Sequence, residues 1–132
     1  MKRYIRAMIR DISDEDEEVR YAIAGNLETA PEELIKLAND PSDSVRWRVA
    51  LNDNTPIEAL KELSKSDNHY ILCAVFCNPN TPIDWIYGLP TDKLMTLAHN
   101  RNTPPKILKA LLKYDYEISS IAERRLREWG EL

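Results

Sequence analysis

The chain has 132 residues, of which 43% are hydrophobic and 30% charged, and this predicts one soluble globular domain rather than a disordered segment. Its 18 basic and 22 acidic residues give a net charge of −4, which argues against nucleic-acid binding over the whole surface but allows a local basic patch. No apolar run reaches the roughly 18 residues needed to cross a bilayer. The N-terminal stretch lacks the apolar core of a signal peptide, so the two cysteines are expected to be free thiols of a cytoplasmic protein.

The first predicted element is a lone amphipathic helix within residues 1–18, which we expect to cap the fold. A pattern then recurs: VRYAIAGN, VRWRVALN and ILCAVFCN begin at Val19, Val45 and Ile71, each 26 residues after the one before. A fourth copy, KLMTLAHN, begins at Lys93 after only 22 residues, because the preceding loop is four residues shorter. We place the repeats at 19–44, 45–70, 71–92 and 93–117. A C-terminal capping helix is predicted over 118–132.

The first half of each repeat predicts a short helix that ends at asparagine. Apolar residues recur four apart, as in Val45 and Val49, and so share one helical face. Asparagine tolerates the left-handed backbone conformation and can bond local backbone groups, so it suits a helix end. The four closing residues are Asn26, Asn52, Asn78 and Asn100. Because they recur in every copy, we interpret them as caps rather than as a polar active site.

The second half of each repeat predicts another short helix, introduced by threonine. The threonine is expected to be the N-cap, its hydroxyl accepting from the first free N–H groups, with proline at the first helical position in three copies. The threonines are Thr29, Thr55, Thr81 and Thr103. Apolar pairs three apart then form one stripe per helix: Leu34/Leu37, Leu60/Leu63, Ile86/Leu89 and Leu108/Leu111.

A helix pair of this size cannot bury its apolar stripe alone, so the copies are expected to stack into an all-α solenoid of about four 22–26-residue repeats with helical caps. The pattern VRxxVAxN…TPxxxLxxL resembles the leucine-rich repeat variant family, over about residues 19–112. The segments VRWRVALNDNTPIEALKEL and NPNTPIDWIYGL carry the resemblance best. It implies a right-handed solenoid of short helices, some of them 3₁₀. The cysteine-rich iron–sulfur module of some relatives does not transfer, since no cysteine precedes Cys73.

The cysteines and histidines lie close together in the sequence, which raises the question of a metal site. His69, Cys73 and Cys77 are spaced by four, but such a run spans about 12 Å along a helix, too far for one tetrahedral ion. Cys73, Cys77 and His99 form the only geometrically sensible trio. Cys73 and Cys77 replace Trp47 and Leu51 of the preceding copy and are therefore interpreted as small apolar core residues. We predict no metal, no cofactor and no catalytic residue.

Stacked repeats place equivalent positions in rows across the surface. One row contains Tyr21 and Trp47, and the next contains Arg20 and Arg46, with Arg48 nearby. Arginine beside aromatic residues is typical of protein-binding hot spots and equally of a surface for phosphates and bases. Alternatively, the rings fill space between layers and the arginine stems cover them.

In the third copy, Trp85 and Tyr87 stand where other copies have small, charged or aliphatic residues. Both are candidates for exposed anchors that contact a partner. The alternative is that they fill the gap left by the four missing residues.

The function predicted is a non-enzymatic scaffold or adaptor, a monomer that binds a protein through Arg20, Arg46, Trp47, Arg48, Trp85 and Tyr87. One alternative is a nucleic-acid binder that uses Arg20, Arg46, Arg48 and the basic clusters at Lys2–Arg10 and Arg124–Arg127. The other is an inhibitor whose acidic run, Asp14–Glu18, binds a basic nucleic-acid-processing protein.

Overall fold

A computed structural model describes residues 16–132 of the chain. These residues form eight α-helices, one 3₁₀-helix and no strand. Contacts divide the chain into two compact units, Met1–Thr81 and Pro82–Leu132. The boundary falls in the third predicted repeat, between its first helix and its second. The predicted N-terminal cap lies almost wholly outside the described residues.

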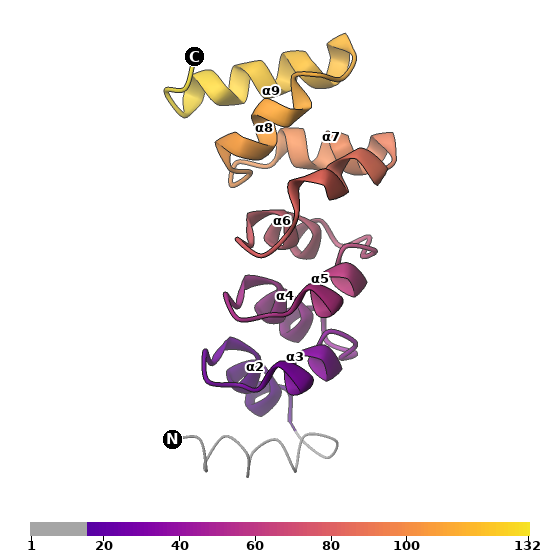
Figure 1. Ribbon diagram of the computed structural model, residues 1–132, viewed down its shortest axis with the longest axis vertical. Coiled ribbons are helices and arrows are strands. Elements are labelled where there is room, and N and C mark those ends of the chain that lie inside the picture. The colour runs from indigo at the N-terminus through magenta and orange to yellow at the C-terminus, as the bar shows by residue number, and fades with distance from the viewer. Residues whose placement is uncertain (1–15) are drawn as a thin grey trace. The chain divides into compact units, whose positions relative to one another are not determined.

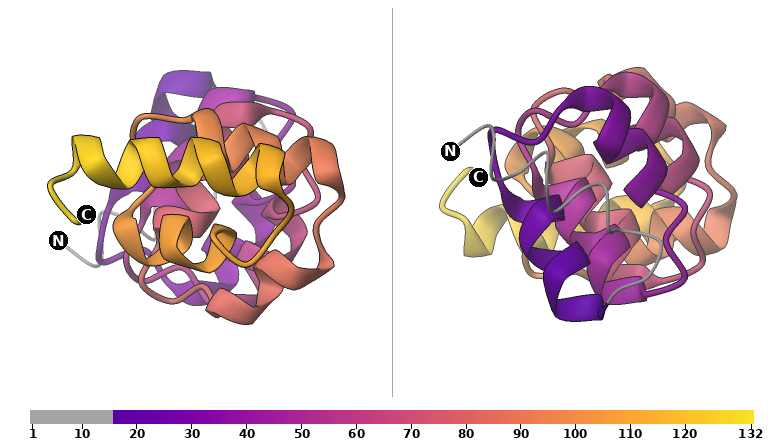
Figure 2. Two further views of the ribbon diagram at one scale, coloured as in Figure 1. Left: turned by 90° about the horizontal axis from the view of Figure 1, so that it is seen from above. Right: turned by 90° about the horizontal axis from the view of Figure 1, so that it is seen from below.

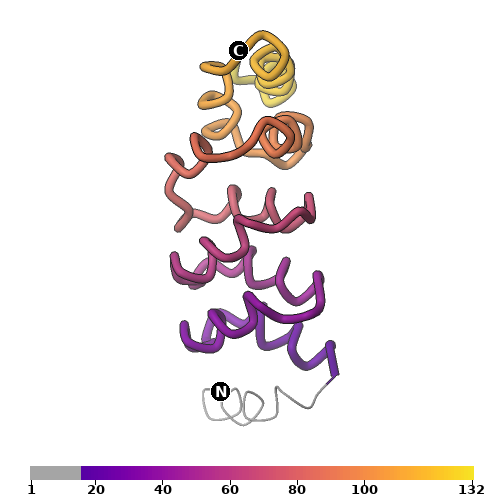
Figure 3. The backbone as a smooth tube through the Cα atoms, turned by 90° about the vertical axis from the view of Figure 1, so that its right-hand side faces the viewer, coloured from indigo at the N-terminus to yellow at the C-terminus, as the bar shows by residue number. Residues whose placement is uncertain are grey.

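The first unit contains three longer helices and two shorter ones that alternate along the chain. The longer helices have nine residues each and are α2 (Glu17–Gly25), α4 (Asp43–Leu51) and α6 (His69–Cys77). The shorter ones have seven residues each and are α3 (Pro31–Leu37) and α5 (Ile57–Leu63). Helix α4 packs between α2 and α6, and α5 packs on α3, α4 and α6, so that the unit consists of successive layers (Figures 1 and 3).

The second unit begins with the 3₁₀-helix η1 (Ile83–Gly88), which takes the place of an α-helix in the third predicted repeat. It continues with α7 (Thr91–His99), α8 (Pro105–Leu111) and the 13-residue α9 (Tyr116–Glu128), where a C-terminal capping helix was predicted. Helix α9 packs on both α7 and α8 (Figure 2). Its buried face consists of Ile118, Ala122 and Leu126, spaced by four along the helix.

The predicted apolar stripes form the core of each unit except at Leu89, which is the C-cap of η1 and is only half-buried. Leu34, Leu60 and Leu108 are fully buried on the short helices, as are Val45, Val49 and Ile71 on the long ones. Helices of seven to nine residues are marginal in isolation, so this burial is what stabilises them.

The long helices of the first unit have side-chain N-caps that the sequence analysis did not predict. Asp16, Ser42 and Asn68 each accept a hydrogen bond from a backbone N–H three residues further on, at Val19, Val45 and Ile71. The three caps occupy equivalent positions, 26 residues apart. Each cap therefore satisfies one of the backbone N–H groups that have no partner within the first turn of a helix.

The prediction that threonine caps the second helices is wrong. The N-cap residues are Ala30, Pro56, Pro82 and Pro104, each one residue after the threonine. The buried threonine hydroxyl instead donates to a carbonyl in the last turn of the preceding helix, from Thr55 to Val49 for example, at 2.6 Å. That carbonyl also accepts from the backbone N–H of the C-cap residue, Asn52, so the hydroxyl gives it a second bond at the helix end, where carbonyl groups lack their usual partners.

The closing asparagines are helix C-caps, as predicted, but none is left-handed. Asn26, Asn52, Asn78 and Asn100 all have extended backbone, with ψ between 122° and 130°. In each, the side-chain oxygen accepts from the N–H two residues on, as in Asn54 to Asn52 at 2.9 Å. This Asx turn reverses the chain without a positive φ.

Candidate functional site

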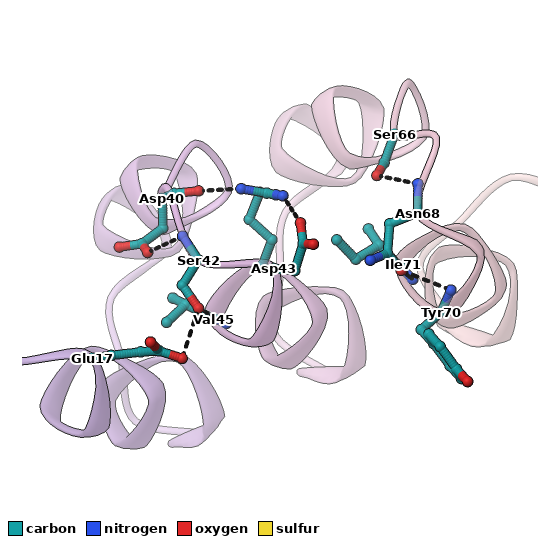
Figure 4. A network of polar contacts seen from close by, with 10 residues as sticks. Glu17, Asp40, Ser42, Asp43, Val45, Ser66, Asn68, Tyr70 and Ile71 are labelled. Carbon is teal, nitrogen blue, oxygen red and sulfur yellow. Dashed lines mark hydrogen bonds and ion pairs between the residues drawn. The ribbon is translucent and has the colours of Figure 1, made fainter.

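Two of the candidate arginines hold the turn that leads from α3 into α4. Arg20 Nε lies 2.7 Å from the carboxylate of Asp40, whose side chain is only 5% exposed. Arg46 donates to the Asp40 carbonyl and pairs with Asp43. Asp40 also accepts from the backbone N–H of Ser42 (Figure 4). Arg20 and Arg46 therefore serve the packing of the first unit, and their charge is matched by Asp40 and Asp43.

The third arginine, Arg48, is bound to the ring of Tyr21. Its guanidinium carbon lies 4.7 Å from the centroid of the ring, and Nη1 donates to the phenol oxygen at 2.8 Å. A Cβ atom at Gly25 would lie 2.2 Å from Arg48 Nε, so only glycine leaves room for this arrangement. Arg48 thus fixes the position of Tyr21 on α2.

Trp47 is half-buried and lines a recess of about 250 Å³ between the first turns of α4 and α6. We call it the Trp47 recess. Its lining residues are Asp43, Ser44, Trp47, Asn68 and Tyr70. Tyr70 is 73% exposed and points away from the other residues labelled in Figure 4. The recess therefore presents two aromatic rings beside one carboxylate.

A second recess adjoins the first. It has a volume of about 750 Å³ and lies between the first turns of α2 and α4; we call it the Tyr21 recess. Its described lining residues are Asp16, Glu17, Glu18, Tyr21 and Ser44. Ser44 lines both recesses, so they share a wall. Glu17 also accepts from the hydroxyl of Ser42 at 2.9 Å, which ties the first turn of α2 to that of α4.

The two recesses are built from equivalent positions of successive predicted repeats. Glu17 corresponds to Asp43 and Tyr21 to Trp47, each pair 26 residues apart, and Ser44 corresponds to Tyr70 in the same way. Trp47 was predicted from the sequence, whereas Tyr70 was not. The signal was available, since Tyr70 departs from the Glu18 and Ser44 of the earlier copies.

In the second unit, Trp85 and Tyr87 both lie on η1. Trp85 is half-buried, whereas Tyr87 is 53% exposed and stacks on Tyr114, with ring centroids 6.5 Å apart and planes 22° apart. Tyr114 donates from its hydroxyl to the Ile86 carbonyl at 3.4 Å. One face of Tyr87 is thus occupied by Tyr114, a contact that supports η1 from the loop between α8 and α9.

Burial raises the pKa of Tyr114 above the ordinary value of 10.0, and repulsion from the Tyr87 phenolate raises it further. The Tyr114 phenol therefore remains a hydrogen-bond donor to Ile86 throughout the neutral pH range. The pair is a structural contact of the second unit.

The basic residues of the C-terminal helix are largely engaged. Arg125 donates to the His99 carbonyl at 2.6 Å and pairs with Glu128, and Arg127 pairs with Glu123 at 2.7 Å. The N-terminal basic cluster, Lys2 to Arg10, lies outside the described residues.

The candidate trio of Cys73, Cys77 and His99 is divided between the two units. Cys73 is buried in α6, Cys77 is half-buried at its end, and His99 is exposed at the end of α7. Within residues 16–132, no group of three or more His, Cys, Asp or Glu side chains is placed to hold a metal ion.

Comparisons with protein-family models, with curated proteins and with solved structures give no match to this chain. Within the described part of the chain, no helix combines the length and apolar character needed to span a bilayer.

Proposed function

We propose that this chain is a non-enzymatic protein-binding module, acting as a small scaffold or adaptor. We further infer that its helix pairs form a short right-handed α-solenoid of the kind found in the leucine-rich repeat variant family. The 26-residue repeat and the layered packing of α2, α4 and α6 support that inference. The proposal includes a monomer in the cytoplasm, where the free thiols of Cys73 and Cys77 would stay reduced.

One observation carries the proposal: aromatic rings line two adjoining recesses while the neighbouring arginines are already engaged. Tyr21, Trp47 and Tyr70 offer large apolar area with few rotatable bonds, and such residues dominate the binding energy of protein interfaces. Tyr70 is 73% exposed in the first turn of α6, and Tyr21 and Trp47 are half-buried in the second turns of α2 and α4. The area of Trp47 and Tyr70 that remains open to solvent is better explained by a partner that covers it.

The same geometry disfavours the nucleic-acid alternative. Arg20 and Arg46 are matched by Asp40 and Asp43, and Arg48 is bound to Tyr21. To bind phosphates, these guanidinium groups would first have to leave the partners that hold them. The carboxylates of the Tyr21 recess would also repel a nucleic-acid backbone.

The proposal is tested by capture from nuclease-treated lysate of the source organism, with wild-type chain and with Trp47→Ala. We expect defined proteins to be retained by the wild type and lost by more than five-fold with Trp47→Ala. Tyr116→Ala is the matched control, because Tyr116 is 86% exposed and lines neither recess. Circular dichroism checks that both variants are folded.

Two results would contradict the proposal. One is equal capture by the wild type and Trp47→Ala. The other is retention of nucleic acid alone, with an affinity that falls steeply with salt, as counterion release from phosphates requires.

A further inference from the structure

The duplication of the recess places two similar binding positions side by side on the first unit. Each has an aromatic ring, Tyr21 or Trp47, and a carboxylate from the preceding turn of the same helix, Glu17 or Asp43. A pair of equivalent positions suits a ligand whose own features repeat. An extended peptide is such a ligand, because its side chains recur at a fixed spacing along it.

The negative charge of the lining residues favours a ligand that carries a positively charged group. The Tyr21 recess is lined by the carboxylates of Asp16, Glu17 and Glu18, all of them on exposed residues, and the described lining of neither recess includes lysine or arginine. The N-termini of α2 and α4 oppose a cation with about half a positive charge each. In the Tyr21 recess, the negative charge of three carboxylates exceeds the partial positive charge of the two helix N-termini.

The Trp47 recess selects a cation chiefly through its rings. Asp43 is its one carboxylate and already pairs with Arg46. A guanidinium group laid on the indole of Trp47 gains a cation–π interaction, which indole provides better than other rings. Arg48 makes the corresponding contact with Tyr21 inside the protein, 4.7 Å from the ring centroid. The Trp47 recess therefore fits arginine better than lysine.

The helix packing sets the spacing between the two cations. Packed helices lie about 8–10 Å apart, and α2 packs directly on α4. A peptide in the polyproline II conformation has three residues per turn and rises about 3.1 Å per residue, so that residues i and i+3 share a face about 9 Å apart. This spacing matches the separation expected between the two recesses.

We propose that the two recesses bind one extended basic segment of a partner protein, with a lysine or arginine in the Tyr21 recess and an arginine in the Trp47 recess, three residues apart. The inference rests on the proposed function and specifies the chemistry of the partner. The ligand is a basic peptide, because its cationic side chains complement both the carboxylates and the exposed rings.

The test measures binding of fluorescein-labelled peptides to the full chain by anisotropy. The probe is a ten-residue Pro/Ser peptide with arginines at positions i and i+3. Its control has the same composition with the two arginines adjacent. We expect the first peptide to bind at least five-fold more tightly, with an affinity that decreases as salt is added.

Substitutions at Ser44 distinguish an effect of charge on peptide binding from an effect of disrupted folding, because Ser44 is exposed and lines both recesses. Ser44→Lys is expected to weaken binding of the i, i+3 peptide at least ten-fold, and Ser44→Glu to strengthen it two-fold or more. Ser120→Lys and Ser120→Glu are the matched controls. Ser120 lies on α9 and lines neither recess, so its variants should bind within two-fold of the wild type.

Three results would overturn the inference. The first is equal binding of the two peptides, and the second is an equal response to Ser44→Lys and Ser44→Glu. The third is binding at least ten-fold tighter when Lys2, Arg3, Arg6 and Arg10 are all replaced by serine, since the chain's own N-terminal segment would then be the occupant. If capture depends on Trp47 but the basic peptides do not bind, the proposed function stands and this inference alone fails.

Discussion

At the scale of single residues, the four repeat threonines join each helix to the loop that follows it. Their hydroxyls donate across six residues, at 2.5 to 2.6 Å, to Ile23, Val49, Val75 and Leu97. Each hydroxyl is buried within a turn that also has a backbone bond, such as Thr55 N–H to the Asn52 carbonyl. The side chain and the backbone of one residue therefore fix the same turn.

Replacing Thr55 with valine tests this bond while keeping the branched shape. The Val49 carbonyl would retain the Asn52 N–H, so we expect a loss of about 1 kcal/mol in the free energy of unfolding by urea, the net value of one hydrogen bond. Thr96→Val is the control, because Thr96 donates to Asp92 within α7 at a half-buried position, and it should change stability by less than about 0.5 kcal/mol. Equal stabilities for wild type and Thr55→Val would contradict the assignment.

At the scale of elements, the asparagines at the ends of α4 and α6 bind each long helix to the one before it. Asn52 donates from its amide to the carbonyls of Ala24 and Asn26, at 2.9 and 3.0 Å, and Asn78 donates to Ala50 and Asn52 in the same way. Both side chains are buried. The oxygen of one side chain thus closes its own loop, and the nitrogen of the same side chain binds the end of the preceding long helix.

Asn52→Asp separates these two roles. The carboxylate could still accept from Asn54, but it would face two carbonyl oxygens in a buried site, so we expect a loss of more than about 2 kcal/mol in unfolding free energy. Asn100→Asp is the matched control, since Asn100 is half-buried and its oxygen accepts from Asn102 in the same kind of turn. That variant should cost less than about 1 kcal/mol. Equal losses in the two variants would show that the bonds to Ala24 and Asn26 contribute nothing to stability.

The helix pairs were predictable from sequence because their signals are local: apolar residues three or four apart, and asparagine at the end. The threonine error was one of position. In a Thr-Pro pair both residues suit the start of a helix. Because the Thr55 hydroxyl donates to the Val49 carbonyl, the N-cap is Pro56 and not Thr55. Periodicity cannot reveal such a bond.

The candidate site was predictable only in part, because it depends on contacts between residues far apart in the sequence. Arginines and rings were visible in the sequence, but the partners of Arg20 and Arg48 lie 20 and 27 residues away along the chain. Tyr70 was overlooked because its importance depends on a recess that α4 and α6 form together.

At the scale of the whole molecule, the division into two compact units predicts how a core defect spreads. Leu60 lies on α5, which packs on α3, α4 and α6, and Leu108 lies on α8, which packs on α7 and α9. Both side chains are fully buried. Truncating either one to alanine should cost about 2–5 kcal/mol.

We expect hydrogen exchange to place each defect within its own unit. Leu60→Ala should accelerate amide exchange mainly in α3 to α6, and Leu108→Ala mainly in α7 to α9, because exchange reports the opening of cooperative segments rather than a single global event. Leu112→Ala, at a position that is 37% exposed, is the control and should leave both patterns nearly unchanged. If either core variant accelerated exchange equally in both units, the two would unfold as one cooperative body, and a partner bound at the Trp47 recess would then stabilise α7 to α9 as strongly as α4 and α6.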